Sequence, residues 1–207
     1  MIESIGGVNV DEQLLSSFRD IPTPLISDNL NRIPGAVGLR PFHKYGAMAG
    51  IALTVKTCAG DNLAIHKALE LVKPGYVIVV DGGGETSRAL IGEIMASIAK
   101  VRGAEGIVID GAIRDIKAIA ELGLPCFARA AIHKGPYKNG PGDINVPVTI
   151  GGMVVNPGDL VVGDDDGVVA FPYAGAAEVL RLARAQEERE AAILKSVREG
   201  TYLSPYV

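Results

Sequence analysis

Short hydrophobic strands alternate with amphipathic helices through the middle of this chain, and this alternation constrains its fold more than any other feature. Residues 76–81 and 105–111 are nearly continuous apolar runs rich in β-branched side chains, which is typical of buried strands. Helical periodicity follows each run after a short link, and a third short strand is expected over 125–130. Because strands joined by helical crossovers share one sheet, the sequence predicts an α/β fold with a parallel or mixed sheet.

The segments on either side extend this pattern. Residues 11–31 are expected to form two short helices interrupted by prolines, and residues 50–57 a strand. Further helices are expected over 61–72, 87–103 and 114–123, where apolar side chains recur with helical spacing and a Gly or Pro follows.

The C-terminal part has a different texture. Between residues 146 and 172, short β runs are separated by Gly-Gly, Asn-Pro-Gly and Asp-Asp-Gly, which predict hairpin turns. Residues 174–199 show the periodicity of a long, charged amphipathic helix. Since no linker or repeat divides the 207 residues, we expect a single domain over residues 1–207. Its N-terminal helices would lie within 1–31 and its C-terminal helix over 174–199.

Composition excludes several classes of protein. The formal net charge of -4, the absence of Trp and the 5% aromatic content argue against a nucleic-acid-binding surface. No apolar stretch reaches the roughly 18 residues needed to cross a membrane. Cys58 and Cys126 are too far apart in the sequence for a metal knuckle or a redox pair. The first residues lack the features of a signal peptide, so we expect a cytoplasmic protein.

Arg114 and Asp115 are the strongest candidates for chemistry on the residues alone. They come just after the strand 105–111, and ligands of open α/β sheets bind beyond the carboxyl ends of strands. The guanidinium group of Arg is a planar fork that fits a carboxylate, and Asp supplies a hard oxygen ligand for Mg²⁺ or Mn²⁺. The alternative is structural, with the aspartate stabilising a helix start and the arginine in a surface ion pair.

Other motifs leave more room for a structural explanation. The Gly-rich turn 81–87 could present backbone amides to an anion or could be only a tight turn. Gly92 and Glu93 interrupt a helical pattern and could mark the true start of that helix. The run 164–167 lies between two β segments, which favours a hairpin turn over a metal site. Three histidines are far apart in the sequence and are expected in structural or surface roles: His43, His66 and His133.

Several segments together resemble the RraA-like family. Their order along the chain is the order seen in that family: GDNLAIHKAL (60–69), PGYVIVVDGGG (74–84), GEIMA (92–96), GIVIDGAIRD (106–115) and VNPGDLVVGDDDGVVAFP (155–172). The resemblance covers roughly residues 20–200, and its most specific element is the spacing from Glu93 to Arg114 and Asp115. It implies a swivelling α/β/β sandwich, assembled as a homotrimer or homohexamer.

The resemblance also implies roles for individual residues. Backbone amides at a helix start would bind the substrate carboxylate, and they belong to Gly92, Glu93, Ile94 and Met95. Arg114 would bind the pyruvyl part of the substrate, and Asp115 would hold the metal, mostly through waters. Glu93 stands where the family's aldolases carry an aspartate, and it would accept the proton of the substrate's C4 hydroxyl. A glutamate from the C-terminal helix of a neighbouring subunit would complete the metal shell; Glu190 matches best, with Glu187 and Glu188 nearby.

The activity implied by the resemblance is that of a divalent-metal-dependent aldolase using Mg²⁺ or Mn²⁺. Its substrate would be a small 2-oxo acid, a 4-hydroxy-2-oxo diacid of the 4-hydroxy-4-methyl-2-oxoglutarate type, and its product pyruvate. Because the cation would stabilise a pyruvate enolate, oxaloacetate decarboxylation is expected as a side activity. No nucleic-acid or membrane partner is implied.

Two other functions remain open at the level of the sequence. The family's namesake is a non-catalytic regulator that binds a ribonuclease, and it can retain the Arg-Asp pair. A methyltransferase of the menaquinone pathway is disfavoured, because the chain lacks a nucleoside-binding G-x-G-x-x-G motif with its ribose-binding acid.

Overall fold

The computed structural model describes residues 2–5, 8–32, 35–44 and 46–205, and its centre is a nine-stranded mixed sheet. The main path through this sheet runs β13-β12-β4-β5-β7-β8-β3, with β6 paired to β7 and β9 to β4. Its strands are β3 (Arg40–Pro41), β4 (Met48–Thr57), β5 (Tyr76–Asp81), β6 (Ala89–Ile91), β7 (Gly106–Ile113), β8 (Cys126–Ala131), β9 (Gly142–Ile144), β12 (Leu160–Asp164) and β13 (Gly167–Phe171). Strands β4, β5, β7 and β8 are parallel, while β3, β9, β12 and β13 pair antiparallel. The predicted α/β fold is confirmed.

Two strand pairs and the helices surround this sheet. The pairs are β1 (Ile2–Ile5) with β2 (Val8–Val10), and β10 (Val148–Ile150) with β11 (Met153–Val155). The helices are α1 (Glu12–Phe18), α2 (Thr23–Asp28), α3 (Leu63–Leu69), α4 (Glu93–Val101), α5 (Ile116–Leu122) and α6 (Ala176–Arg198), with a 3₁₀ turn η1 (Tyr173–Gly175) before α6.

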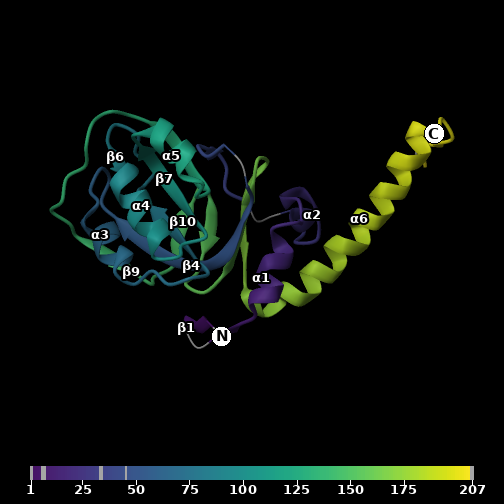
Figure 1. Cartoon of the computed structure of the whole chain (residues 1–207), viewed down its shortest axis with the longest axis horizontal. Coiled ribbons are helices and arrows are strands. Elements are labelled where there is room, and N and C mark those ends of the chain that lie inside the picture. The colour runs from purple at the N-terminus through teal and green to yellow at the C-terminus, as the bar shows by residue number, and fades with distance from the viewer. Residues whose placement is uncertain (1, 6–7, 33–34, 45, 206–207) are drawn as a thin grey trace.

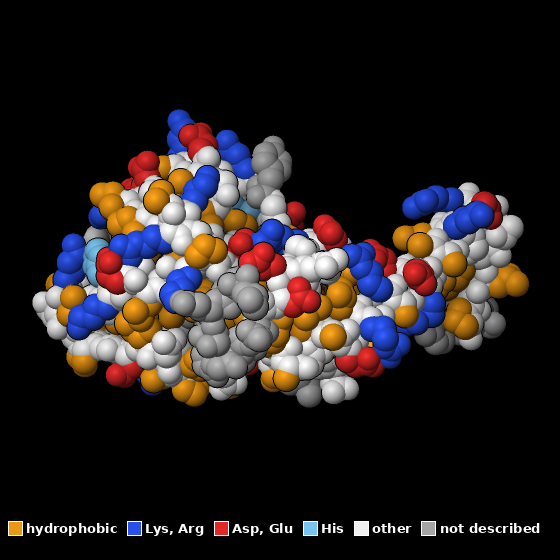
Figure 2. Space-filling view, turned by 60° about the horizontal axis from the view of Figure 1, so that its bottom comes forward, with side chains coloured by type: hydrophobic (Ala, Val, Ile, Leu, Met, Phe, Trp, Pro, Cys, Tyr) orange, Lys and Arg blue, Asp and Glu red, His pale blue; other side chains and the backbone are white. Residues whose placement is uncertain are grey.

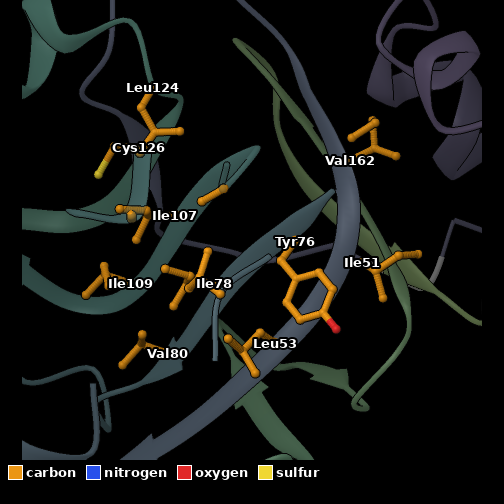
Figure 3. Close-up of a cluster of buried hydrophobic side chains, with 14 of the residues drawn as sticks. Ile51, Leu53, Tyr76, Ile78, Val80, Ile107, Ile109, Leu124, Cys126 and Val162 are labelled. Carbon is orange, nitrogen blue, oxygen red and sulfur yellow. The ribbon is translucent and has the colours of Figure 1, made fainter. Parts of the chain in front are cut away.

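Alternating side chains of the central strands make the layers of a sandwich. Ile78 and Val80 of β5 point into a core shared with the helices, and Figure 3 shows them beside the side chains of β4 and β7. Val77 and Val79 of the same strand point to the opposite face, where they pack against β10 and β11. Because both faces are covered, β5 reads as one continuous apolar run. In Figure 1, α3, α4 and α5 lie together over one side of the sheet. The layers are therefore helices, main sheet and small second sheet, the expected α/β/β arrangement.

Helix α6 projects away from the layered sandwich. Its buried residues, Ala176, Val179 and Ala183, all lie in its first half, which packs near α1 and α2. The rest extends away from the sheet to the C-terminal end of the chain (Figure 1). Exposed apolar side chains follow along this extension, including Ile193 and Leu194. Figure 2 shows hydrophobic side chains (orange) on the projecting part of the molecule. No helix in the described part of the chain is both long and apolar enough to cross a membrane.

One expected helix is shorter than its periodicity suggested. Instead of a helix over 87–103, the chain forms the short strand β6 and then α4, with Gly92 between them in an extended conformation. The apolar residues Ala89–Ile91 match helical spacing equally well, but they pair in parallel with the end of β7. This arrangement matters, because it puts the start of α4 at the carboxyl edge of the sheet.

Candidate functional site

Arg114 and Asp115 meet the start of α4 at the carboxyl end of β7. The backbone N–H of Arg114 donates to Ile91 O at 3.0 Å, which continues the pairing of β6 with β7. The backbone N–H of Glu93 then donates to Asp115 Oδ2 at 3.1 Å. Arg114 Nε lies 3.6 Å from the same Oδ2, and both side chains are nearly half exposed. Asp115 has a left-handed backbone (φ 56°), which Asp tolerates better than most residues.

Gly92 allows this close approach. A Cβ atom at Gly92 would overlap Asp115 Oδ2 and would lie 3.0 Å from Arg114 Cγ and 3.1 Å from Arg114 Nε. Its backbone is extended, so it is the missing side chain, and not an unusual φ angle, that matters here. A glycine at this position is therefore required by the packing of the Arg-Asp pair against α4.

A cavity of about 200 Å³ opens beside the pair. Its walls come from the start of α3, the junction of β6 and α4, the end of β7 and the loop after β8. The lining residues are Asn62, His66, Leu90, Ile91, Gly92, Ile94, Met95, Arg114, Asp115, Pro136 and Lys138. The amides of Ile94 and Met95 belong to the first turn of α4, where backbone N–H groups have no partner within the helix. The cavity thus combines a cation, a carboxylate and free amide donors.

Two buried polar atoms at this cavity have no hydrogen-bond partner in the described part of the chain: Asn62 Oδ1 and His66 Nε2. Asn62 is 3% exposed, and its Nδ2 donates to Leu90 O at 2.9 Å, which leaves the carbonyl oxygen alone. Burial, and then the charge of Lys138, lowers the pKa of His66, so its imidazole is neutral at neutral pH. Since unsatisfied buried polar groups are rare and costly, these atoms mark where a ligand or water makes its contacts.

The loop over the cavity is fixed by Asp61. Its Oδ1 accepts from the N–H of Leu63 at 2.9 Å, and its Oδ2 accepts from the N–H groups of Asn139 and Gly140. Burial opposes ionisation of this carboxyl, but the three amide donors outweigh burial and lower its pKa. Asp61 therefore holds the segment that carries Lys138 against the start of α3.

A stacked pair fixes the same loop from the other side. Arg88 donates to Gly135 O at 2.9 Å and to the Tyr137 hydroxyl at 2.7 Å. Its guanidinium carbon also lies 4.0 Å from the centre of the Tyr137 ring.

The structure brings together some of the residues expected from the sequence and separates others. Gly92, Ile94, Met95, Arg114 and Asp115 all line the cavity. The side chain of Glu93 is exposed at the first turn of α4, next to the lining residues but not among them. Its backbone amide is already used by Asp115, which leaves the next two amides for a ligand.

Glu190 lies outside this site within a single chain. It is exposed on the projecting part of α6 and accepts a hydrogen bond from Gln186 Nε2 at 2.8 Å. Glu187 pairs with Arg184 on the same helix, and Glu188 is exposed there. In Figure 1, α6 runs away from α4 and α5.

A metal at this site would rest on few protein ligands. The described residues contain no group of three or more His, Cys, Asp or Glu side chains arranged to hold an ion. Both contacts of Asp115 use Oδ2, which leaves Oδ1 available to a cation. One partly exposed carboxylate suits a hard divalent ion such as Mg²⁺, which keeps most of its waters. The donor set therefore fits a largely hydrated cation.

Three polar lining residues are not among those expected from the sequence: Asn62, His66 and Lys138. The spacing of Asn62 and His66 was a usable signal, because residues four apart share one face of a helix. His66 had been expected in a structural or surface role, and its unpaired nitrogen at the cavity departs from that. His43, by contrast, is structural: its Nε2 lies 3.0 Å from Gly46 O, and its ring packs edge-on against Phe127.

The Gly-rich turn after β5 is a tight turn. The N–H groups of Gly82 and Gly84 both donate to Asp110 O, and the N–H of Gly83 donates to Asp81 Oδ1 at 3.0 Å. These amides are engaged within the protein, so the anion-site interpretation of this segment has no support. The run after β12 is likewise a hairpin turn, in which Asp164 is paired with Gly167.

Comparison with known proteins agrees with this architecture. The profile of the RraA-like family, described as Aldolase/RraA, matches residues 23–170. The chain belongs to the RraA-like family. A relative from Halalkalibacterium halodurans is 41% identical over 188 residues, which cover 88% of this chain and 90% of the relative. That protein is named "Putative 4-hydroxy-4-methyl-2-oxoglutarate aldolase".

Solved structures share the fold. An uncharacterized protein from Pseudomonas syringae pv. tomato superposes with a TM-score of 0.82 at 29% identity, covering 94% of this chain and 96% of that one. A protein described as the RNA-processing inhibitor RraA from Thermus thermophilis superposes with a TM-score of 0.68 at 32% identity, covering 74% and 93%. The named aldolase relatives support a lyase of the RraA-like family.

Proposed function

We propose that the protein is a divalent-metal-dependent pyruvate aldolase that acts on 4-hydroxy-2-oxo diacids such as 4-hydroxy-4-methyl-2-oxoglutarate. One observation carries the proposal: Arg114, Asp115 and the start of α4 converge on a cavity that also holds two unpaired polar atoms. These groups supply what retro-aldol cleavage needs, namely an anion-binding site, a place for a cation and fixed dipoles. Oxaloacetate, which also gives a pyruvate enolate on losing CO₂, is the expected side substrate.

Each polar group at the cavity has a role that follows from its chemistry. Arg114 and the first-turn amides of α4 bind the carboxylate and carbonyl oxygens at the pyruvyl end of the substrate. Asn62 Oδ1 can only accept a hydrogen bond, so it binds a water in the cavity beside the substrate. Lys138 adds positive potential at the mouth, which favours a doubly charged acid. Glu93, exposed at the first turn of α4, accepts the proton of the C4 hydroxyl.

The cation would be held by Asp115 through Oδ1 and retained waters, and by Glu190 of a neighbouring subunit. When bound, Mg²⁺ or Mn²⁺ acts as a Lewis acid that stabilises negative charge on the substrate's C2 oxygen. No lysine needs to form a Schiff base, and Lys138 serves only as a charge. Because Glu190 lies far from the cavity of its own chain, the active form is a homo-oligomer.

A mixing experiment tests this assignment. Arg114→Ala and Glu190→Gln are purified separately, and pyruvate release from 4-hydroxy-4-methyl-2-oxoglutarate is measured with Mg²⁺. Each variant alone should be nearly inactive. After dissociation and reassembly at equal amounts, about a quarter of the sites would combine an intact Arg114 with an intact Glu190 of another chain. A mixture with no more activity than its components would contradict the shared site, and an inactive wild type would contradict the aldolase proposal itself.

The ribonuclease-regulator function gives the cavity no role. A binding surface for a protein partner needs no buried, unpaired amide oxygen beside a carboxylate and a guanidinium group. The solved RraA neighbour from Thermus thermophilis shares the fold, and fold alone does not decide between the two functions.

A further inference from the structure

A second cavity, of about 450 Å³, shares Arg114 and Asp115 with the first. Its remaining lining residues are Ile116, Ala131, Ile132 and His133. Because the same two residues line both cavities, the Arg-Asp pair forms the boundary between them. The two cavities differ in their polar side chains: besides the pair, the first has Asn62, His66 and Lys138, whereas the second has His133 with three apolar residues.

The pairing of β7 with β8 explains why His133 lies beside the pair. The two strands are parallel, and Ile113 is opposite Ala131 in the register. The N–H of Ile132 donates to Ile113 O at 2.9 Å, so the pairing continues to the last residue of β7. The residues that follow this pairing, Arg114 after β7 and His133 after β8, consequently leave the sheet at the same edge.

We propose that this second cavity holds the leaving half of the substrate and that His133 recognises its carboxylate. The inference rests on the proposed aldolase function, which requires two fragments to be accommodated on either side of one bond. Apolar Ile116 and Ile132 fit the methyl group at C4 of a branched substrate, and the imidazole N–H fits the carboxylate at C5. The leaving fragment is thus a short, negatively charged 2-oxo acid that comes from the branched end of the substrate.

Retro-aldol cleavage leaves one fragment in each cavity. The C4 hydroxyl loses its proton to the base, the O–H electron pair forms the C4 carbonyl, and the C3–C4 bond breaks. Its electrons pass to the pyruvyl fragment as an enolate in the first cavity, and C3 is then protonated to give pyruvate. The C4 fragment leaves as a second 2-oxo acid from the cavity that contains His133.

A matched pair of substrates tests the contact between His133 and the substrate's C5 carboxylate. 4-Hydroxy-4-methyl-2-oxoglutarate and 4-hydroxy-4-methyl-2-oxopentanoate differ only in the carboxylate or methyl group on C4, and both release pyruvate. The preference of the enzyme is the ratio of kcat/KM for the diacid to kcat/KM for the monoacid. His133→Leu should lower this ratio about tenfold, the effect of one lost hydrogen bond to a charged group. His133→Lys, whose ammonium group also donates a hydrogen bond to a carboxylate, should restore most of it.

Lys134→Leu is the control variant, because Lys134 is a neighbouring exposed cation that does not line either cavity. It should keep the wild-type ratio. An unchanged ratio in His133→Leu, or an equal fall in Lys134→Leu, would overturn the role of His133 while leaving the aldolase intact. A separate assay, exchange of the C3 protons of pyruvate by the wild-type enzyme with Mg²⁺, tests the enolate chemistry alone. Its absence would overturn the proposed function and this inference with it.

Discussion

Replacing Gly92 with alanine should remove activity while leaving the fold largely intact. The new Cβ would overlap Asp115 Oδ2 and crowd Arg114 at 3.0 and 3.1 Å, so the Asp115 carboxylate must move by about 1 Å and Arg114 by a few tenths of an ångström to reach normal contact distances. A displacement of about 1 Å in a positioning group can cost about 100-fold in rate. The hydrogen bond from the Glu93 N–H to Asp115 would also be lost. Since both displaced side chains are nearly half exposed and can rotate into solvent, the free energy of unfolding should fall by only about 1 kcal/mol.

The assay is steady-state pyruvate release with Mg²⁺, combined with urea unfolding of the same preparations. Gly175→Ala is the matched control, because its Cβ would meet no atom within 4 Å and its φ of -89° suits any residue. The control should keep both its activity and its stability. A Gly92→Ala enzyme with more than half of the wild-type kcat/KM would refute the argument that Gly92 sets the position of the Arg-Asp pair.

Three further results are expected. Asp61→Asn should lower the free energy of unfolding by about 2 kcal/mol at pH 7, because it weakens the amide contacts that hold the loop. The pKa of Asp61 is lowered below 3.8, so this stabilisation is present above that value and is lost as the pH falls through the folded-state pKa. Urea unfolding at pH 3 should therefore show a smaller difference between variant and wild type. Lys138→Ala should raise the pKa of His66 only part of the way toward 6.5, since burial is the larger cause of its depression; an NMR titration that shows no change would contradict this. A thiol reagent at pH 8 should label exposed Cys58 alone, because burial raises the pKa of Cys126 to about 12, and labelling of both thiols in the folded protein would be inconsistent with the structure.

The sheet was predictable because its central strands are covered on both faces. Burial on both faces demands continuous apolar runs, and β5 and β7 carry them. Strand β6 escaped detection because its three apolar residues fit helical spacing as well as strand pairing. Only Gly92 signalled the break, and its real reason, the closeness of Asp115, is a contact between segments more than twenty positions apart.

The site was predictable only where one segment carried it. Arg114 and Asp115 follow a recognisable strand, so their place at the sheet edge could be inferred from order alone. Asn62 and His66 reach the cavity because α3 packs beside β6, and Lys138 reaches it because Asp61 binds two amides of a distant loop. These are tertiary contacts without a local sequence pattern. The proposed role of Glu190 would require a second chain, and the spacing of residues in one sequence does not encode the position of another chain.

The measurement that tests the central claim most directly is pyruvate release from 4-hydroxy-4-methyl-2-oxoglutarate. It should be made with Mg²⁺, with EDTA, and with Arg114→Ala in the presence of Mg²⁺. The account predicts turnover with the metal, none with EDTA, and a fall of at least about 100-fold in the variant, in which the substrate's anionic end has lost its guanidinium partner. Release no faster than that of Mg²⁺ without protein, or equal rates in wild type and variant, would contradict the assignment of an aldolase site to the Arg114–Asp115 cavity.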